Sequence, residues 1–483
     1  MTARQSEILS STNGPNSARP RRAIVVTFDH LHLGYLGCYG NDWIETPHFD
    51  RLASRSVVFD RHCCENVDPA AANHAWWNGI YQFAIDPDRQ RKCPSVLDAL
   101  HDVSVKTHLV VESDGRDDAT IAPPFGEVSS VRGTDGFDVA EGATPFACTV
   151  KKCAQWLADS ALVESALAES TGHANPQLLW IKSRGVPVPW VPPRDFAELY
   201  LDEFGLAARG DEGHFDDEAL GVDSNDDLND ESDDAADGDG TTTKEPDDAA
   251  AATSAAPLDD SLDWRYAATM YAAYVTLLDR GLGKLLATIE ESPDWKGALL
   301  IVTAGAGQAL GEHGSLADER VPLRAECLQT PLWVCLPESD QAGTRRQSLV
   351  QTVDLAPTLL EWFCRPAAVP VPMPPASNRP ADSFSGKSLL PLVRNEVTAH
   401  RDMALMGNGR SEWGIRTDDF FYVEPGDDAP QPERSPPMLF EKPHDRWDQF
   451  DVLSQFPQVS DDLRNTLRAR IKQLDNSLTN EPA

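Results

Sequence analysis

Short hydrophobic runs recur along the chain, and stretches with helical spacing separate them. The apolar run from Ala23 to Phe28 ends in Asp29, as expected of a strand buried on both faces of a parallel sheet. Similar runs follow at 107–112, 177–183, 297–304 and 330–337. This alternation predicts an α/β fold, with helices covering both faces of a mostly parallel sheet.

Two helical patterns are the clearest. Between residues 260 and 292, apolar residues recur at spacings of three and four, so one face of a long helix should pack on the sheet. A second helix is expected at 352–363, with Asp354 near its start. Pro357 would lie in its first turn, where a missing N–H costs little.

The C-terminal part, residues 397–483, differs from the rest in its pattern of hydrophobic and polar residues. Two short strand candidates with a turn come first, and an amphipathic helix with Ser460 as its N-cap follows. We therefore expect a smaller α+β subdomain with an antiparallel sheet and a helix. The larger α/β domain would span residues 22–396, after a disordered N-terminus at 1–21.

A strongly acidic segment interrupts the larger domain at residues 209–258. Its core, 210–248, holds 17 Asp or Glu residues against Lys244 alone. With almost no large apolar side chains it should stay disordered. The Asp spacing misses the pattern of a calcium-binding loop, and a solubilising spacer is favoured over a docking tail for basic partners.

The whole chain of 483 residues is also acidic, with a formal net charge of −35. Such a field repels nucleic acid and anionic membrane surfaces, so neither is an expected partner. The ligand, any protein partner and the oligomeric state stay open. The polar first 22 residues, the lack of a long apolar segment and the odd number of cysteines indicate a cytoplasmic protein with free thiols.

Five blocks carry motifs in a characteristic order. They are "AIVVTFDHLHLGYLGCYGNDWIETPHFDRLASRSVVFDRHC" (23–63), "LLIVTAGAGQALGEHGS" (299–315), "TVDLAPTLLEWF" (352–363), "SGKSLLPLVRNE" (385–396) and "MLFEKPHDRWDQFDVL" (438–453). Together they resemble the sulfatase family of the alkaline phosphatase superfamily. The resemblance implies a three-layer α/β/α sandwich with a small C-terminal subdomain. It also implies hydrolysis of sulfate or sometimes phosphate esters on one divalent cation, commonly calcium.

The metal positions that the resemblance implies are largely replaced. Asp29 matches the family's first ligand, but His30 stands where a second Asp belongs. Gly305 and Ala306 stand where the family has an Asp followed by Asn or His, and neither has a side-chain donor. A hard cation needs several oxygen ligands, so Asp29 and His30 alone would form a weak site.

The nucleophile position is degenerate as well. The family carries a Cys or Ser, matured to formylglycine, in a C/S-x-P-x-R motif. Here the alignment places Pro69 at the nucleophile, or Asp68 if shifted by one, and Asn73 at the Arg, with His74 beside it. From Glu65 to Lys92 the chain holds no Ser, Thr or Cys, so no side chain there could form the covalent intermediate.

The anion-binding positions have changed sign. Glu112 and Asp114 stand where the family has Lys and His. Each would repel an anionic substrate by about 4 kcal/mol at ~4 Å with an effective dielectric near 20.

Three further residues would complete a remnant of the substrate pocket. Glu312 and His313 suit a supporting turn better than catalysis. Trp76 opens a predicted helix together with Trp77, and the pair would fill space left by lost polar groups, although an aromatic ligand pocket is the alternative.

These replacements predict a sulfatase-like protein that has lost ester hydrolysis and serves in binding or as a scaffold, without a cofactor. The alternative is a divergent sulfate or phosphate ester hydrolase with a remodelled metal site around Asp29 and His30. His32, His62 and His74 could add ligands. Calcium or a transition metal is expected only in that second case.

Overall fold

The computed structural model describes residues 21–83, 95–113, 125–171, 175–201, 263–316, 323–364, 384–409, 411–427 and 436–477. The acidic insertion at 209–258, residues 1–20 and Asp114 lie outside these ranges.

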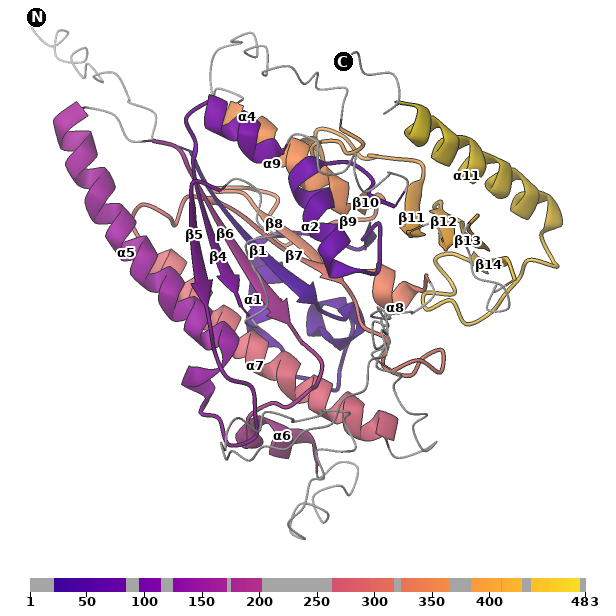
Figure 1. The fold of residues 1–483 in the computed structure, drawn as a ribbon, viewed down its shortest axis with the longest axis horizontal. Coiled ribbons are helices and arrows are strands. Elements are labelled where there is room, and N and C mark those ends of the chain that lie inside the picture. The colour runs from indigo at the N-terminus through magenta and orange to yellow at the C-terminus, as the bar shows by residue number, and fades with distance from the viewer. Residues whose placement is uncertain are drawn as a thin grey trace, which may run out of the picture.

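A large sheet forms the centre of the molecule (Figure 1), with the strand order β5-β4-β6-β1-β7-β8-β2-β9. The strands are β1 (Arg22–His30), β2 (Val57–Phe59), β4 (Lys106–Glu112), β5 (Glu127–Val131), β6 (Gln177–Gly185), β7 (Leu299–Ala306), β8 (Leu332–Cys335) and β9 (Arg345–Arg346). Strand β1 pairs in parallel with β6 and β7. Strand β8 runs antiparallel to both of its neighbours. The other five strand pairs of the sheet are parallel, so the expectation of a mostly parallel sheet is confirmed.

Helices cover both faces of this sheet (Figure 1). One face carries α1 (Pro47–Arg55), α5 (Pro145–Thr171), α6 (Arg194–Leu201) and α7 (Asp263–Glu291). The other face carries α2 (Pro69–Asn78), α4 (Val96–Asp102), α9 (Leu355–Cys364) and α10 (Leu390–Val393). The predicted three-layer α/β/α sandwich is therefore confirmed.

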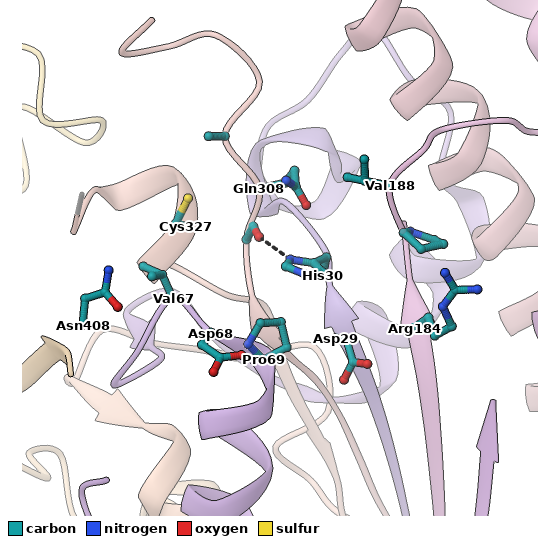
Figure 2. Close-up of a pocket in the computed structure, with 13 residues that line it drawn as sticks. Asp29, His30, Val67, Asp68, Pro69, Arg184, Val188, Gln308, Cys327 and Asn408 are labelled. Carbon is teal, nitrogen blue, oxygen red and sulfur yellow. Dashed lines mark hydrogen bonds between the residues drawn. The ribbon is translucent and has the colours of Figure 1, made fainter. Parts of the chain in front are cut away.

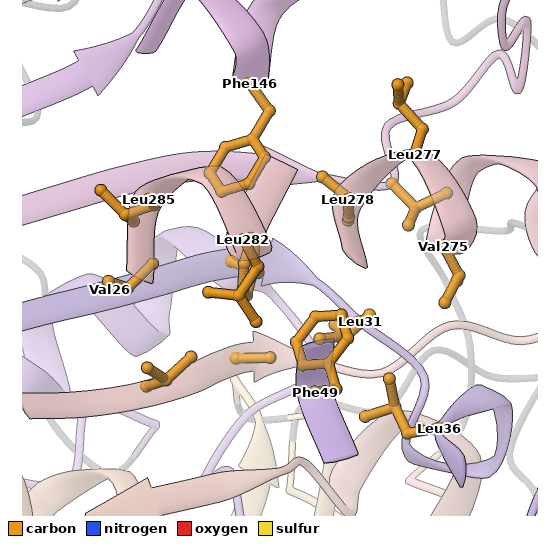
Figure 3. Packing of buried hydrophobic residues seen from close by; sticks show 14 of the residues in the cluster. Val26, Leu31, Leu36, Phe49, Phe146, Val275, Leu277, Leu278, Leu282 and Leu285 are labelled. Atoms are coloured by element: carbon orange, nitrogen blue, oxygen red, sulfur yellow. The ribbon is translucent and has the colours of Figure 1, made fainter. Parts of the chain in front are cut away.

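The long helix α7 shows why the layers hold together. Its residues Leu278, Leu282 and Leu285 are buried and point toward the sheet (Figure 3). They pack in one cluster with Val26 of β1 and with Phe49 of α1. The helical spacing seen in the sequence thus becomes a continuous apolar stripe that fills the space between helix and sheet.

The C-terminal part forms a four-stranded antiparallel sheet beside the sandwich (Figure 1). Its strands are β11 (Ala404–Asn408), β12 (Glu412–Arg416), β13 (Phe420–Pro425) and β14 (Met438–Glu441), and α11 (Pro457–Ser477) packs on it. The sequence pattern gave two strands before residue 426, where the structure has three.

The start of α11 was also placed wrongly. The helix begins at Pro457, whose missing N–H suits the first helical position. Ser460 lies inside the first turn, where its hydroxyl donates to the carbonyl of Phe456 at 3.1 Å instead of capping the helix.

Short elements complete the fold. They are η1 (Leu33–Tyr35), η2 (Gly37–Tyr39), η4 (Glu141–Ala143), η8 (Thr352–Asp354), α8 (Ala325–Leu328) and the paired strands β3 (His62–Cys63) and β10 (Val350–Gln351). Among the helices in the described ranges, none combines the length and the apolar character needed to cross a bilayer.

Candidate functional site

A pocket of about 690 Å³ opens where the central strands end. Asp29 and His30 reach it from β1, Arg184 from β6, and Asp68 and Pro69 from the start of α2 (Figure 2). In parallel α/β sheets, binding sites form at the carboxyl ends of the strands. The pocket therefore brings four of the predicted site residues together: Asp29, His30, Asp68 and Pro69.

The carboxylate of Asp29 is already paired within the protein. Nζ of Lys182 donates to its Oδ2 at 2.7 Å, and the two side chains are only 11% and 17% exposed. Lys182 lies beside Thr27 in the register of β6 against β1, so it points to the same face of the sheet as Asp29 two residues on. The other oxygen of Asp29, Oδ1, is buried and has no hydrogen-bond partner.

An indole ring occupies the space beside Gly305. A Cβ on Gly305 would lie 3.2 Å from the ring of Trp76 and 3.2 Å from the Cβ of Ala72. Trp76 is fully buried. Any side chain at position 305 would thus push α2 away from β7, and the missing Cβ allows their close approach.

Trp76 and Trp77 are filling residues and do not line the pocket around Asp29. Their rings lie 6.3 Å and 6.1 Å from the ring of Trp180 on β6. Both lie near the end of α2, so the expectation that they begin the helix is wrong: the chain turns into helix already at Pro69. Pro at the first helical position explains this earlier start.

The histidines near the pocket do not converge. Nδ1 of His30 lies 3.1 Å from the carbonyl oxygen of Gly307 (Figure 2). His32 points elsewhere, with Nε2 3.2 Å from Glu312. His62 is buried against Thr330.

The family's divalent cation therefore does not fit the residues around Asp29. That carboxylate is held by an ammonium group, and positions 305 and 306 carry no donor. In the described ranges, no group of three or more His, Cys, Asp or Glu side chains could hold a metal ion.

The beginning of α2 lacks a nucleophile. Pro69 is the first residue of the helix, and the N–H of Asp68 donates to Oδ1 of Asn66 at 2.9 Å. Asn73 is buried, with Oδ1 unpartnered, and does not line the pocket. The residue His74 lies at the surface, and partial desolvation of its imidazole by neighbouring atoms lowers its pKa.

Glu112 lies outside the Asp29 pocket, in a crevice beside Arg184 and Tyr274. Its Oε2 accepts the backbone N–H of Arg184 at 2.9 Å. Burial raises the pKa of Glu112 to about 7. The carboxylate thus supports the end of β6 and does not face a substrate in the larger pocket.

Glu312 and His313 support the loop after β7. Burial opposes ionisation of Glu312, but the hydrogen bond from His32 lowers its pKa overall. Nδ1 of His313 lies 2.7 Å from Glu326, and Nε2 lies 3.0 Å from the carbonyl oxygen of Asp448. The hydrogen bond to Glu326 raises the pKa of His313, so both residues have structural partners and neither lines the pocket.

The sequence analysis did not single out two basic residues at this site: Lys182, which pairs with Asp29, and Arg184, which lines the pocket. They are the basic residues that end the apolar run of β6, spaced two apart. That spacing on a strand places them on the same face, which was a usable signal. Gln308, Cys327 and Asn408 also line the pocket, but they come from three separate segments whose convergence no local pattern reveals.

Comparison with known proteins agrees with the fold and the motifs. A family model described as Sulfatase matches residues 21–364. The N-acetylglucosamine-6-O-sulfatase of Bacteroides thetaiotaomicron is 26% identical over 204 residues, which cover 40% of this chain and 31% of that protein. The multifunctional alkaline phosphatase superfamily protein PehA of Trinickia caryophylli is 30% identical over 111 residues, covering 23% and 21%. The chain thus aligns with less than a third of either relative's length.

Solved structures match over nearly the whole chain. The phosphonate monoester hydrolase of Agrobacterium radiobacter superposes with a TM-score of 0.63 at 17% identity, covering 94% of this chain and 96% of that one. A protein solved with its substrate, D-glucosamine-2-N,6-O-disulfate, gives a TM-score of 0.66 at 18% identity, covering 96% and 99%. The fold is shared, and the family match spans most of the chain: the protein belongs to the sulfatase family, within the alkaline phosphatase superfamily.

Proposed function

We propose that this chain is a sulfatase-family protein that no longer hydrolyses esters and that uses the inherited fold for binding. One observation supports this above the others: the ion pair between Lys182 and Asp29 at 2.7 Å. A fixed ammonium beside the first ligand balances the charge that a divalent cation would otherwise balance. Binding a cation there would require expelling Lys182 against direct repulsion.

The nucleophile position supports the same proposal. Pro69 carries no group that can attack sulfur or phosphorus, and the adjacent Asp68 lies near the N-terminus of α2, where an anionic substrate would otherwise meet backbone N–H groups. A carboxylate there repels sulfate and phosphate esters. Loss of the nucleophile removes the covalent route.

The pocket itself still suits a small polar ligand. Its volume of about 690 Å³ lies within the ~300–1,000 Å³ range of small-molecule sites. The lining includes the guanidinium of Arg184, whose Nη1 also lies 3.5 Å from Asp135, and the carboxylate of Asp68 (Figure 2). We infer a ligand that carries both an anionic and a cationic group.

We also place the protein in the cytoplasm, in keeping with its eight described free cysteines.

The test combines metal analysis with assays on aryl sulfates, phosphate monoesters and phosphonate monoesters, with an active sulfatase as positive control. We expect less than stoichiometric metal, no turnover, and a melting temperature unaffected by EDTA. Turnover that Asp29→Ala abolishes would contradict the proposal.

One observation favours the alternative, a divergent hydrolase with a remodelled metal site. Oδ1 of Asp29 is buried without a partner, which leaves one oxygen for a cation beside His30. This hypothesis predicts about one transition metal per chain, lost in His30→Ala together with activity. If metal is absent from the wild type and from Lys182→Ala, the alternative is wrong.

A further inference from the structure

A second pocket, of about 290 Å³, lies between the large sheet and the C-terminal sheet. It is lined by Arg61, which follows β2, Arg345 of β9, Arg416 of β12 and Arg446, which follows β14. It shares no lining residue with the Asp29 pocket. Its residues come from six separate segments of the chain, so the fold itself assembles the cluster.

The charges in this pocket do not balance. Four guanidinium groups line it, and Asp60 is the one carboxylate among the described residues of its lining. Asp60 is already engaged: Nε of Arg345 donates to its Oδ1 at 2.9 Å, and Gln347 binds its other oxygen. Outside the lining, Asp418 pairs with Arg61 at 2.7 Å, and Lys442 pairs with Asp448.

Arg416 and Arg446 are short of anionic partners. Arg416 is only 6% exposed, its Nε has no hydrogen-bond partner, and its Nη1 reaches only the sulfur of Cys63 at 3.8 Å. Nη1 of Arg446 donates to the carbonyl oxygen of Tyr39 at 3.2 Å. Burial lowers the pKa of Arg446. The Asp60 carboxylate opposes this shift, and the Arg345 and Arg416 guanidinium groups add to it.

This concentration of positive charge stands out in a chain with a net charge of −35. Like-charged guanidinium groups held together by the fold repel one another. A guanidinium fork matches the geometry of tetrahedral oxyanions, to which it donates paired hydrogen bonds. The volume is close to the lower limit of small-molecule sites, about 300 Å³.

We propose that this arginine pocket binds a small molecule through a phosphoryl or sulfo group, independently of the pocket around Asp29. The oxyanion lies between Arg61, Arg416 and Arg446. Arg61 shares its charge between this anion and the exposed Asp418, while Arg345 stays paired with Asp60. The remaining volume accommodates the rest of a small ligand. Because both sheets contribute arginines, the bound anion also links the two parts of the molecule.

Isothermal titration calorimetry on the full chain tests this with four probes: inorganic phosphate, inorganic sulfate, glucose 6-phosphate and glucose 6-sulfate, at constant ionic strength set with sodium chloride. We expect one site per chain. Equal affinity for the ions and the esters identifies a free-anion site, and tighter binding of the esters identifies a metabolite site. If no probe binds more tightly than chloride, the proposal is wrong.

Variants locate the site. Arg446→Gln and Arg61→Gln should each weaken binding about tenfold or more, as expected when one charge-assisted hydrogen-bonding group is lost. Arg446→Lys keeps the positive charge but loses the forked guanidinium, so its loss of anion affinity should be smaller than that of Arg446→Gln. It replaces Arg446→Gln in the test if that variant folds poorly. The exposed Arg470→Gln on α11 is the matched control and should bind as the wild type does.

A further variant separates the two pockets. Arg184→Gln removes the guanidinium from the Asp29 pocket and should leave binding of the four probes unchanged. If Arg184→Gln abolishes binding while Arg446→Gln and Arg61→Gln do not, the anion binds at the other pocket and the proposal is overturned.

Discussion

The pairing of Asp29 with Lys182 changes what one carboxylate can do. A divalent cation gathers six or more oxygens and orients them, whereas an ammonium group brings a single charge and three donors. Lys182 therefore neutralises Asp29 at 2.7 Å without creating a Lewis acid. The result is a largely buried ion pair at a position that the resemblance assigns to a metal ligand.

Replacing Lys182 by Met should show how much the Asp29 carboxylate destabilises the protein when it has no cationic partner. The Asp29 carboxylate, which is 17% exposed, would lose its cationic partner, and we expect a loss of about 1–3 kcal/mol in the free energy of unfolding. Urea denaturation measures it. The double variant Lys182→Met with Asp29→Asn should recover most of the loss, and Lys472→Met, exposed on α11, is the control. A single variant as stable as the wild type would argue against the ion pair.

Glu65 leads to a prediction about how the stability of the protein depends on pH. It is fully buried, Oε1 has no partner, and burial raises its pKa to about 8. A raised pKa means that its contribution to stability is complete below the unfolded value near 4.5 and is lost as pH rises through about 8.

Glu65→Gln should therefore stabilise the protein at pH 8.5 by about 1–3 kcal/mol and change little near pH 4.5. Urea midpoints at several pH values measure this. Glu441→Gln, at an exposed position, should show no such pH-dependent gain. Equal effects of Glu65→Gln at both pH values would refute the assignment.

At the level of elements, β1, β4, β6 and β7 were predictable because each is an apolar run long enough to be buried on both faces. Strand β5 was missed because it lies at the sheet edge and its sequence, EVSSV, is mostly exposed. The antiparallel direction of β8 depends on pairing with β2 and β7, which are distant in sequence. Long-range pairing also hid the contact of Lys182 with Asp29, while the resemblance did locate Asp29 and Pro69.

The contact of α2 with β7 leads to a prediction for Gly305. Gly305→Asp, the residue type the family carries there, should destabilise the protein by more than about 3 kcal/mol, because it adds an unpaired charge beside Trp76. Thermal denaturation and soluble yield measure the effect. Gly305→Ala, which meets the same contacts at 3.2 Å without a charge, should cost less. If the Asp variant is as stable as wild type, the indole does not fill this space.

At the scale of the whole molecule, one segment joins the two sheets. Lys442 and Asp448 form an ion pair in which both side chains are at most 1% exposed. Oδ2 of Asp448 accepts the N–H of Ala325 in α8 at 2.7 Å, and its carbonyl oxygen lies 3.0 Å from Nε2 of His313. Hydrogen bonds therefore connect the segment after β14 to the loop and the short helix that follow β7.

Removing the ion pair between Lys442 and Asp448 should destabilise the C-terminal sheet and the large sheet together. Lys442→Met leaves the Asp448 carboxylate buried without its cation, and breaking one side of such a pair costs about 3–5 kcal/mol. Hydrogen exchange followed by mass spectrometry should show faster exchange in β11–β14 and also in β7 and α8, because the N–H of Ala325 depends on Asp448. Asp461→Ala, exposed on α11, is the control. Faster exchange confined to the C-terminal sheet would mean that the two parts unfold independently and that this buried pair does not couple them.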